Sequence, residues 1–156
     1  MNETAAAQQP MFNIEKLYVK DLSLEIPHAP GIFLEREQPQ IDLQLHTQAA
    51  SVDDGVFEVV VTVTVTAKLM EKDKVMFLVE AKQAGIFQLR NLPQEEMDTV
   101  LGVVCPNIIY PYLREVVSDV TVRAGFAPVL LNPINFEALY LQKKEQQATG
   151  APVTTH

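Results

Sequence analysis

The side chains best suited to catalysis or metal binding in this chain are three histidines and one cysteine. His28 lies in the segment 27–30, His46 lies near the end of a predicted strand, and His156 is the last residue. No two of these histidines have the spacing of metal ligands, and Cys105 is far from all of them in the sequence. Because Cys105 is the only cysteine, it cannot form an internal disulfide, and we interpret it as a small buried hydrophobe.

Acidic pairs and glycines add little to the case for an enzyme. Asp53-Asp54 precedes Gly55 as in a turn, and Glu95-Glu96 stands where the first turn of a helix favours negative charge. The six glycines are scattered and form no phosphate-binding loop. The sequence therefore predicts no catalytic residues, no cofactor and no metal site.

Composition indicates one acidic domain with an apolar core. The chain has 156 residues, 12 Lys and Arg against 20 Asp and Glu, a net charge of −8, and 47% hydrophobic residues. This length suits one domain that buries a core. The negative charge argues against a nucleic-acid partner and favours basic partners. No apolar run reaches roughly 18 residues and the N-terminal residues lack a signal-peptide pattern, so we expect a cytoplasmic protein without membrane insertion.

Alternation of apolar and polar residues predicts four β-strands. The clearest strand is Val56–Met70, where every second residue from Phe57 to Leu69 is apolar. Turn residues precede and follow it, so neighbouring strands are expected to be antiparallel. The same alternation appears in Tyr18–Ile26, Ile41–His46 and Val75–Lys82.

Helical spacing replaces this alternation in the second half of the chain. Apolar residues recur at helical intervals over 97–105, are interrupted at Pro106 and resume over 109–120. Gly125 is placed to end this helix, and a last short helix is predicted at about 136–143.

Strands followed by helices predict an α+β fold, with a four-stranded antiparallel sheet and helices packed on one face. We expect the domain to comprise residues 12–141. The segments 1–11 and 142–156 are rich in residues that bury poorly, so we predict flexible tails there.

Two surfaces of the predicted fold are candidates for binding. The polar side of the sheet is acidic with a few aliphatic residues, so it is either a solvated face or a docking site for a basic partner. Aromatic residues in loops and at helix ends either belong to the core or line a groove for apolar segments. The polar side carries Asp21, Glu25, Asp42, Glu58, Glu80, Lys68, Lys82, Val60, Met76 and Leu78, and the aromatic set is Phe33, Phe87, Tyr110, Tyr112, Phe126, Phe136 and Tyr140.

Distinctive motifs run through most of the chain. They are LYVKDLSLEIPHAPGIF (Leu17–Phe33), VFEVVVTVTVTAKL (Val56–Leu69), QAGIFQL (Gln83–Leu89), and the long stretch Leu101–Tyr140, which contains Cys-Pro-Asn, Tyr-Pro-Tyr and Pro-Ile-Asn-Phe in this order. Over residues 12–142 the chain resembles SecB, the bacterial protein-export chaperone family.

The resemblance implies a homotetramer, assembled as a dimer of dimers. It also implies a chaperone that works without ATP, binds unfolded secretory precursor proteins in the cytoplasm, keeps them competent for translocation and delivers them to the motor protein SecA. The positions that match the SecA contacts of the family are Asp21, Glu25, Leu78 and Glu80, all on the polar side of the sheet. For the client groove, the resemblance and the aromatic set together suggest Phe33, Phe87, Tyr110, Phe126, Phe136 and Tyr140.

Two other classes of protein stay open on the residues alone. One is an α+β cone that binds a small molecule, or an enzyme with an apolar pocket. Such a pocket needs a buried ionisable group, and the inward strand positions offer none. The other is a purely structural subunit of an oligomer.

Overall fold

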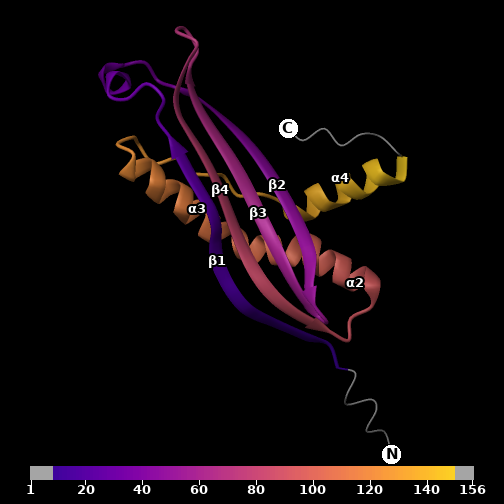
Figure 1. Cartoon of the computed structure of the whole chain (residues 1–156). Helices are drawn as coiled ribbons and strands as arrows, with labels where there is room; N and C mark the ends of the chain where they lie inside the picture. Colours follow the sequence, from indigo (N-terminus) through magenta and orange to yellow (C-terminus); the bar gives the residue numbers. More distant parts are fainter. Residues whose placement is uncertain (1–8, 150–156) are drawn as a thin grey trace, which may run out of the picture.

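Four long antiparallel strands form a single sheet, and the helices cover one of its faces (Figure 1). The structure is a computed structural model that describes residues 9–149. In this range the strand order is β1-β4-β3-β2, so β1 and β2 are the two edges. The elements are β1 (Met11–Glu25), the 3-10 turn η1 (Gly31–Leu34), β2 (Gln40–Asp53), β3 (Val56–Leu69), β4 (Lys74–Arg90), α2 (Gln94–Thr99), the π-helical turn η2 (Val100–Val104), α3 (Cys105–Arg123) and α4 (Phe136–Thr149).

The predicted sheet is confirmed, but β1, β2 and β4 are longer than the alternation indicated. β4 continues beyond Lys82, where both faces of the strand are covered and alternation is lost: Ala84 and Phe87 point to opposite faces, and both are buried. In β1, register shifts follow Ile14 and Val19 and break the period of two. Buried faces and bulges therefore hide strand residues from a pattern of period two.

The helical layer also extends beyond the prediction. α2, η2 and α3 follow one another without a break, so Pro106 does not interrupt the helix as predicted; it lies directly after the π-helical turn η2, where the regular pattern of helical hydrogen bonds is already altered. Gly125, with φ of 95°, follows α3 as expected for a C-terminal stop. Residues 142–149, predicted as part of a tail, are helical in α4. The remaining tail residues, 1–8 and 150–156, lie outside the described part of the chain.

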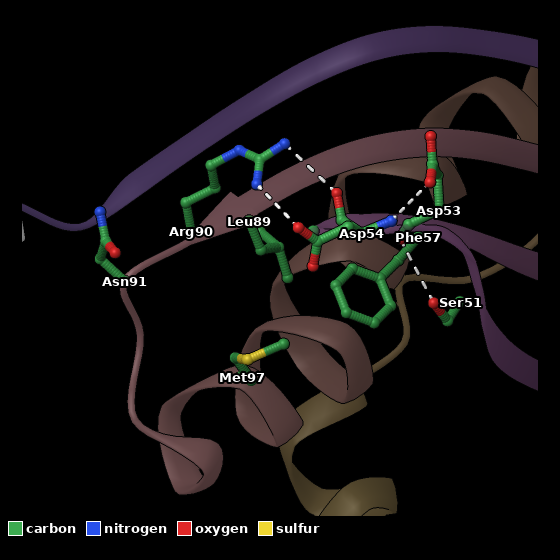
Figure 2. A pocket seen from close by; sticks show the side chains of 9 residues that line it. Ser51, Asp53, Asp54, Phe57, Leu89, Arg90, Asn91 and Met97 are labelled. Atoms are coloured by element: carbon green, nitrogen blue, oxygen red, sulfur yellow. Dashed lines mark hydrogen bonds and ion pairs between the residues drawn. The ribbon is translucent and has the colours of Figure 1, made fainter.

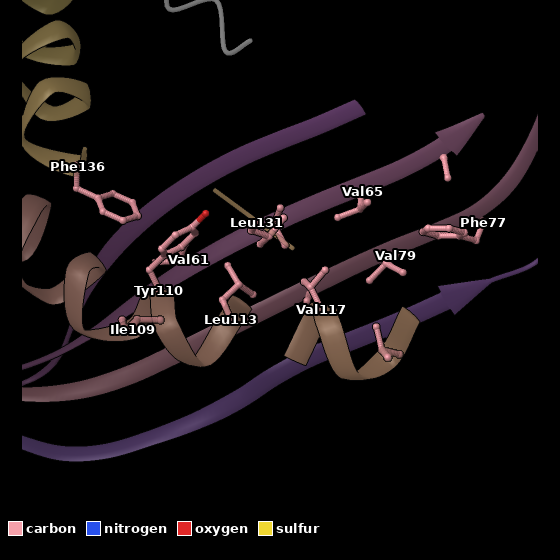
Figure 3. Close-up of a cluster of buried hydrophobic side chains, with 14 of the residues drawn as sticks. Val61, Val65, Phe77, Val79, Ile109, Tyr110, Leu113, Val117, Leu131 and Phe136 are labelled. Atoms are coloured by element: carbon pink, nitrogen blue, oxygen red, sulfur yellow. The ribbon is translucent and has the colours of Figure 1, made fainter. Parts of the chain in front are cut away.

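The core lies between α3 and the two central strands. Figure 3 shows side chains of α3 directed toward β3 and β4. Ile109, Leu113 and Val117 recur at helical spacing and are completely buried, as are Val65 and Val79 in the strands. Because α3 covers β3 and β4, the same face of β1 and β2 is left partly uncovered.

By length and composition, the continuous helix Gln94–Arg123 is able to cross a membrane. No other helix among the described residues is long and apolar enough to do so. In this structure 39% of its most apolar window is buried inside the protein. The core helix of a soluble protein passes the same test, and packing on the sheet accounts for those apolar residues of α3 that belong to the core cluster.

Candidate docking surfaces

The predicted acidic surface lies on the outer face of the sheet, by which we mean the face opposite the helices. Glu25 of β1 is paired with Leu78 of β4, and Asp21 is paired with Lys82. We call residues that are paired across neighbouring strands a row, and Glu80 lies between the two rows just named. The four predicted residues Asp21, Glu25, Leu78 and Glu80 therefore occupy three successive rows on one face of two adjacent strands. Strand spacing and rise place these rows within about 14 Å of one another. The structure therefore brings the predicted residues together on one surface.

The rows continue across the sheet to the opposite edge. Leu78 is paired with Thr66 of β3, and Thr66 is paired with Asp42 of β2. Asp42 is exposed, so the acidic surface includes both edges of the sheet.

The carboxylates of this surface have no partner within the described residues. Asp21, Glu25, Asp42 and Glu80 make no side-chain hydrogen bond or ion pair there, although Lys82 is the strand neighbour of Asp21. Unpaired carboxylates around a half-buried leucine leave the surface free to attract a basic partner.

Glu58, at the other end of the outer face, is engaged within the protein. Its carboxylate accepts a hydrogen bond from Lys20 Nζ at 2.7 Å and another from the Tyr18 hydroxyl. These two hydrogen bonds lower the pKa of Glu58, while burial and the neighbouring Glu58 raise the pKa of Tyr18 to about 12. This group is structural, in contrast to the unpaired carboxylates.

Two aliphatic residues predicted for this surface are not available on it. Met76 lies next to a register shift between Ala67 and Lys68, and it is 7% exposed within the core cluster, so its predicted place on the polar side is wrong. Val60 does lie on the outer face but is 1% exposed. Of the three predicted aliphatic residues, Leu78 is the one that contributes to the surface.

Half of the predicted groove residues are buried in the core. Phe87, Phe136 and Tyr110 are 0%, 2% and 6% exposed. The Tyr110 ring packs edge-on against Phe136, and its hydroxyl donates a hydrogen bond to the backbone carbonyl of Asn132. In this conformation a client cannot reach these three side chains, so their role is to stabilise the fold.

Phe33, Phe126 and Phe77 form what we call the aromatic stack. The Phe33 ring of η1 stacks on Phe126, with centroids 5.1 Å apart, and Phe126 packs on Phe77 of β4 at 4.7 Å. Phe77 is buried, Phe126 is half-buried and Phe33 is 47% exposed. The stack therefore joins the core to an exposed aromatic ring.

Tyr140, the last predicted groove residue, attaches α4 to η2. Its ring lies against Gly102, where a Cβ atom would be 2.6 Å from the ring. The Lys144 ammonium lies 5.7 Å from the centre of the same ring. Tyr140 is half-buried, and its main contact is with the body of the protein.

Exposed apolar side chains on the helix-facing side of both edge strands were missed by sequence reasoning. Alternation placed Leu22, Leu24, Ile41 and Leu43 on the apolar side of their strands, but only the strand order shows that the whole set lies beyond the cover of α3. Their exposure, 36–48%, is unusual for a sheet face that packs against a helix. They are Phe12, Ile14, Val19, Leu22 and Leu24 in β1, and Ile41 and Leu43 in β2.

An open depression of about 370 Å³ lies at the end of the sheet (Figure 2). Its rim carries Arg90, which donates a hydrogen bond to the backbone carbonyl of Asp54 and pairs with its carboxylate at 3.8 Å. Within the described chain no group of three or more His, Cys, Asp or Glu side chains is placed to hold a metal ion. Cys105 is buried, and desolvation raises its pKa to about 12, which leaves it a neutral thiol.

Comparison with known proteins decides between the open classes. The family model described as preprotein translocase subunit SecB matches residues 5–147. The chain belongs to the SecB family. It is 64% identical to the protein-export protein SecB of Methylobacillus flagellatus over 99% of this chain and 98% of that protein, and 63% identical to that of Nitrosomonas eutropha over 96% and 93%. Membership fits an export chaperone and does not fit the alternative of a small-molecule carrier or enzyme.

The fold matches a solved structure of the same kind. A SecB-like chaperone of Mycobacterium tuberculosis, solved in complex with a ChAD peptide from the HigA1 antitoxin, superposes with a TM-score of 0.64 at 18% identity. The match covers 83% of this chain and 93% of that one. The four-stranded antiparallel sheet with helices on one face is therefore the SecB-like fold, as the sequence predicted.

Proposed function

We propose that this SecB-family chain is a subunit of a cytoplasmic, ATP-independent holdase that hands unfolded secretory precursors to SecA. The observation that carries the proposal is the pairing of two unlike surfaces on one thin sheet. The helix-facing side has exposed apolar residues beyond the cover of α3, and the outer face has unpaired carboxylates around Leu78. An unfolded client and a basic partner protein can thus bind opposite sides at the same time.

The client surface in this proposal begins at the aromatic stack and continues along β2. Phe33 and Phe126 present aromatic rings, and Ile41 lies in the same strand row as Phe77, across Ala67. Leu43 is in the next row. Aliphatic and aromatic side chains of this kind bind exposed apolar segments, which an unfolded chain offers and a folded one does not.

Self-association is proposed for the apolar row of β1 and the exposed side of α3. Leu22 and Leu24 in β1, and Tyr112 and Val122 in α3, are 36–53% exposed. Apolar side chains concentrated on one strand and one helix are typical of contacts between subunits. A tetramer built on these contacts would carry several client surfaces, so a long client binds more tightly through effective concentration.

SecA docking is proposed for Asp21, Glu25, Leu78 and Glu80. The four side chains lie on one side of the sheet. None of the three carboxylates has a partner among the described residues that would compete with SecA for it. Attraction to a basic surface would speed association and weaken with salt, while Leu78 contributes apolar contact.

The test is a titration of SecA against the double variant Asp21→Ala/Glu80→Ala at low salt. We expect SecA affinity to fall several-fold or more while capture of an unfolded client is unchanged. Glu95→Ala/Glu96→Ala on α2 is the matched control, because it removes the same charge from exposed positions elsewhere. SecA affinity equal to that of the control would refute docking on the outer face.

A further inference from the structure

Lys82 places a positive charge inside the acidic docking surface. It lies two residues from Glu80 on the outer face of β4, and it is the strand neighbour of Asp21 in β1. Lys20 and Lys68 form ion pairs within the protein. In contrast, Lys82 makes no side-chain hydrogen bond or ion pair in the part of the chain that the structure describes. Its charge is therefore available to a partner.

Lys82 is close enough to Asp21 for an ion pair, but none is formed. Side chains directly opposite each other on antiparallel strands have Cβ atoms about 5 Å apart, and long charged side chains span this distance easily. A register shift between Val19 and Asp21 distorts β1 at this point. The docking surface thus presents the positive charge of Lys82 beside the negative charges of Asp21, Glu25 and Glu80, without an internal ion pair between them.

The outer face of β4 carries three different side chains at a regular spacing. Leu78, Glu80 and Lys82 are alternate residues of one strand, so successive members of the series lie about 7 Å apart on the same face. The series is apolar, negative and positive. An extended segment of a partner protein has the same spacing. The segment that complements this series carries an apolar, a basic and an acidic residue at every second position.

A segment with basic residues alone does not fit the same series. One of its lysines or arginines would face Lys82, and like charges brought together at an interface weaken binding. The repulsion is useful, because a net charge of −8 attracts basic segments of unfolded clients to acidic surfaces in general. Specific interfaces commonly combine attraction of the right partner with repulsion of the wrong one.

We propose that Lys82 is a specificity-determining residue of the docking surface. It pairs with a carboxylate of a SecA segment that has a lysine or arginine two residues away, and it repels purely basic client segments from the outer face. This inference rests on the proposed function, because it concerns the same SecA surface. Basic clients are thereby left to the helix-facing side, and the outer face stays open to SecA.

The experiment compares the SecA affinities of Lys82→Glu and Lys16→Glu at low salt. Lys16 is the matched control, because it is exposed on the same outer face, in the row of Ile86, and its reversal changes the net charge equally. Lys82→Glu should lower SecA affinity several-fold although it makes the protein more acidic, whereas Lys16→Glu should leave the affinity unchanged or raise it. A SecA affinity of Lys82→Glu equal to or above that of Lys16→Glu would overturn the proposal.

A neutral variant removes the charge without adding a repulsion. Lys82→Glu puts a like charge opposite Asp21, which can disturb the sheet, whereas Lys82→Gln does not. Capture of a urea-denatured precursor at the wild-type level shows that a variant is folded. Lys82→Gln should bind SecA more weakly than Lys16→Gln does. Equal SecA affinities of these two folded variants would contradict a role of Lys82 in docking.

A second measurement tests the repulsion of basic segments, with a fluorescein-labelled peptide of alternating lysine and serine as the probe. Lys82→Gln should bind this peptide several-fold more tightly than Lys16→Gln does, and adding Asp21→Ala/Glu80→Ala should remove the gain. Equal binding of the peptide by Lys82→Gln and Lys16→Gln would overturn the repulsive role. If the Lys82 variants match their controls while Asp21→Ala/Glu80→Ala still weakens SecA binding, the docking site stands and the role of Lys82 is wrong; if that double variant also has no effect, both fail.

Discussion

The attachment of α4 through Tyr140 leads to a sharp prediction at Gly102. A Cβ atom at Gly102 would lie 2.6 Å and 2.9 Å from two atoms of the Tyr140 ring, which is closer than real Cβ contacts. Gly102→Ala should therefore push Tyr140, and α4 with it, away from η2. The backbone itself does not resist alanine, because Gly102 lies within a helical turn and lacks a positive φ.

The magnitude follows from two opposing effects. Alanine in a helix interior gains about 1 kcal/mol over glycine, and overpacking of this kind costs about 1–3 kcal/mol. The net change for Gly102→Ala is thus a loss of up to about 2 kcal/mol, or several degrees in Tm for a chain of this length. When Tyr140 is replaced by alanine the clash disappears, and Gly102→Ala should then stabilise the protein by about 1 kcal/mol.

The assay is urea unfolding of Gly102→Ala, Tyr140→Ala and the double variant at one fixed protein concentration. Gly31→Ala is the control, since a Cβ at Gly31 meets nothing within 4 Å and should leave stability unchanged or slightly raised. A coupling energy of about 1–3 kcal/mol between the two sites is expected. Additive changes, or a stabilising Gly102→Ala in the wild-type background, would refute the account of how α4 is attached.

Three further results should follow from polar and buried groups. Glu58 has a lowered pKa, so the stability that its hydrogen bonds contribute is present above the pKa of an ordinary glutamate and is lost as the pH falls through the lowered pKa. Acid unfolding curves of Glu58→Gln should lack this contribution to the free energy of unfolding. Thr121→Val should cost about 1–3 kcal/mol in urea unfolding, because the Thr121 hydroxyl accepts a hydrogen bond from Val129 N–H at 3.0 Å, and unchanged stability would contradict this role. Burial raises the pKa of Cys105 to about 12, so iodoacetamide at pH 8 should label it only after denaturation, and rapid labelling of the folded protein would show that the site is open.

The sheet was predictable because its strongest strand alternates cleanly. β3 begins at Val56 as expected and ends at Leu69, within one residue of the predicted end. The second half of β4 was hidden because Ala84 and Phe87 are buried on opposite faces, which removes the contrast that alternation needs. Pro106 was misread as a break, because the helix continues through it directly after the π-helical turn η2, and the sequence pattern does not reveal such a turn.

The docking surfaces were predictable to different degrees. Strand phase placed Asp21, Glu25 and Glu80 on one face, because side chains alternate along a strand whatever its neighbours are. Whether an aromatic residue lies in the core or in a groove depends on tertiary contacts, and Phe87 and Phe136 are core residues for that reason. The exposed rows of β1 and β2 needed the strand order, which no local pattern records.

The most direct test of the central claim is light scattering on a size-exclusion column, with the protein alone and mixed with a precursor. The account predicts a tetramer that binds the urea-denatured precursor and leaves the same precursor unbound once it has folded. A monomer that binds neither form, or an oligomer that binds folded and unfolded precursor equally well, would contradict it.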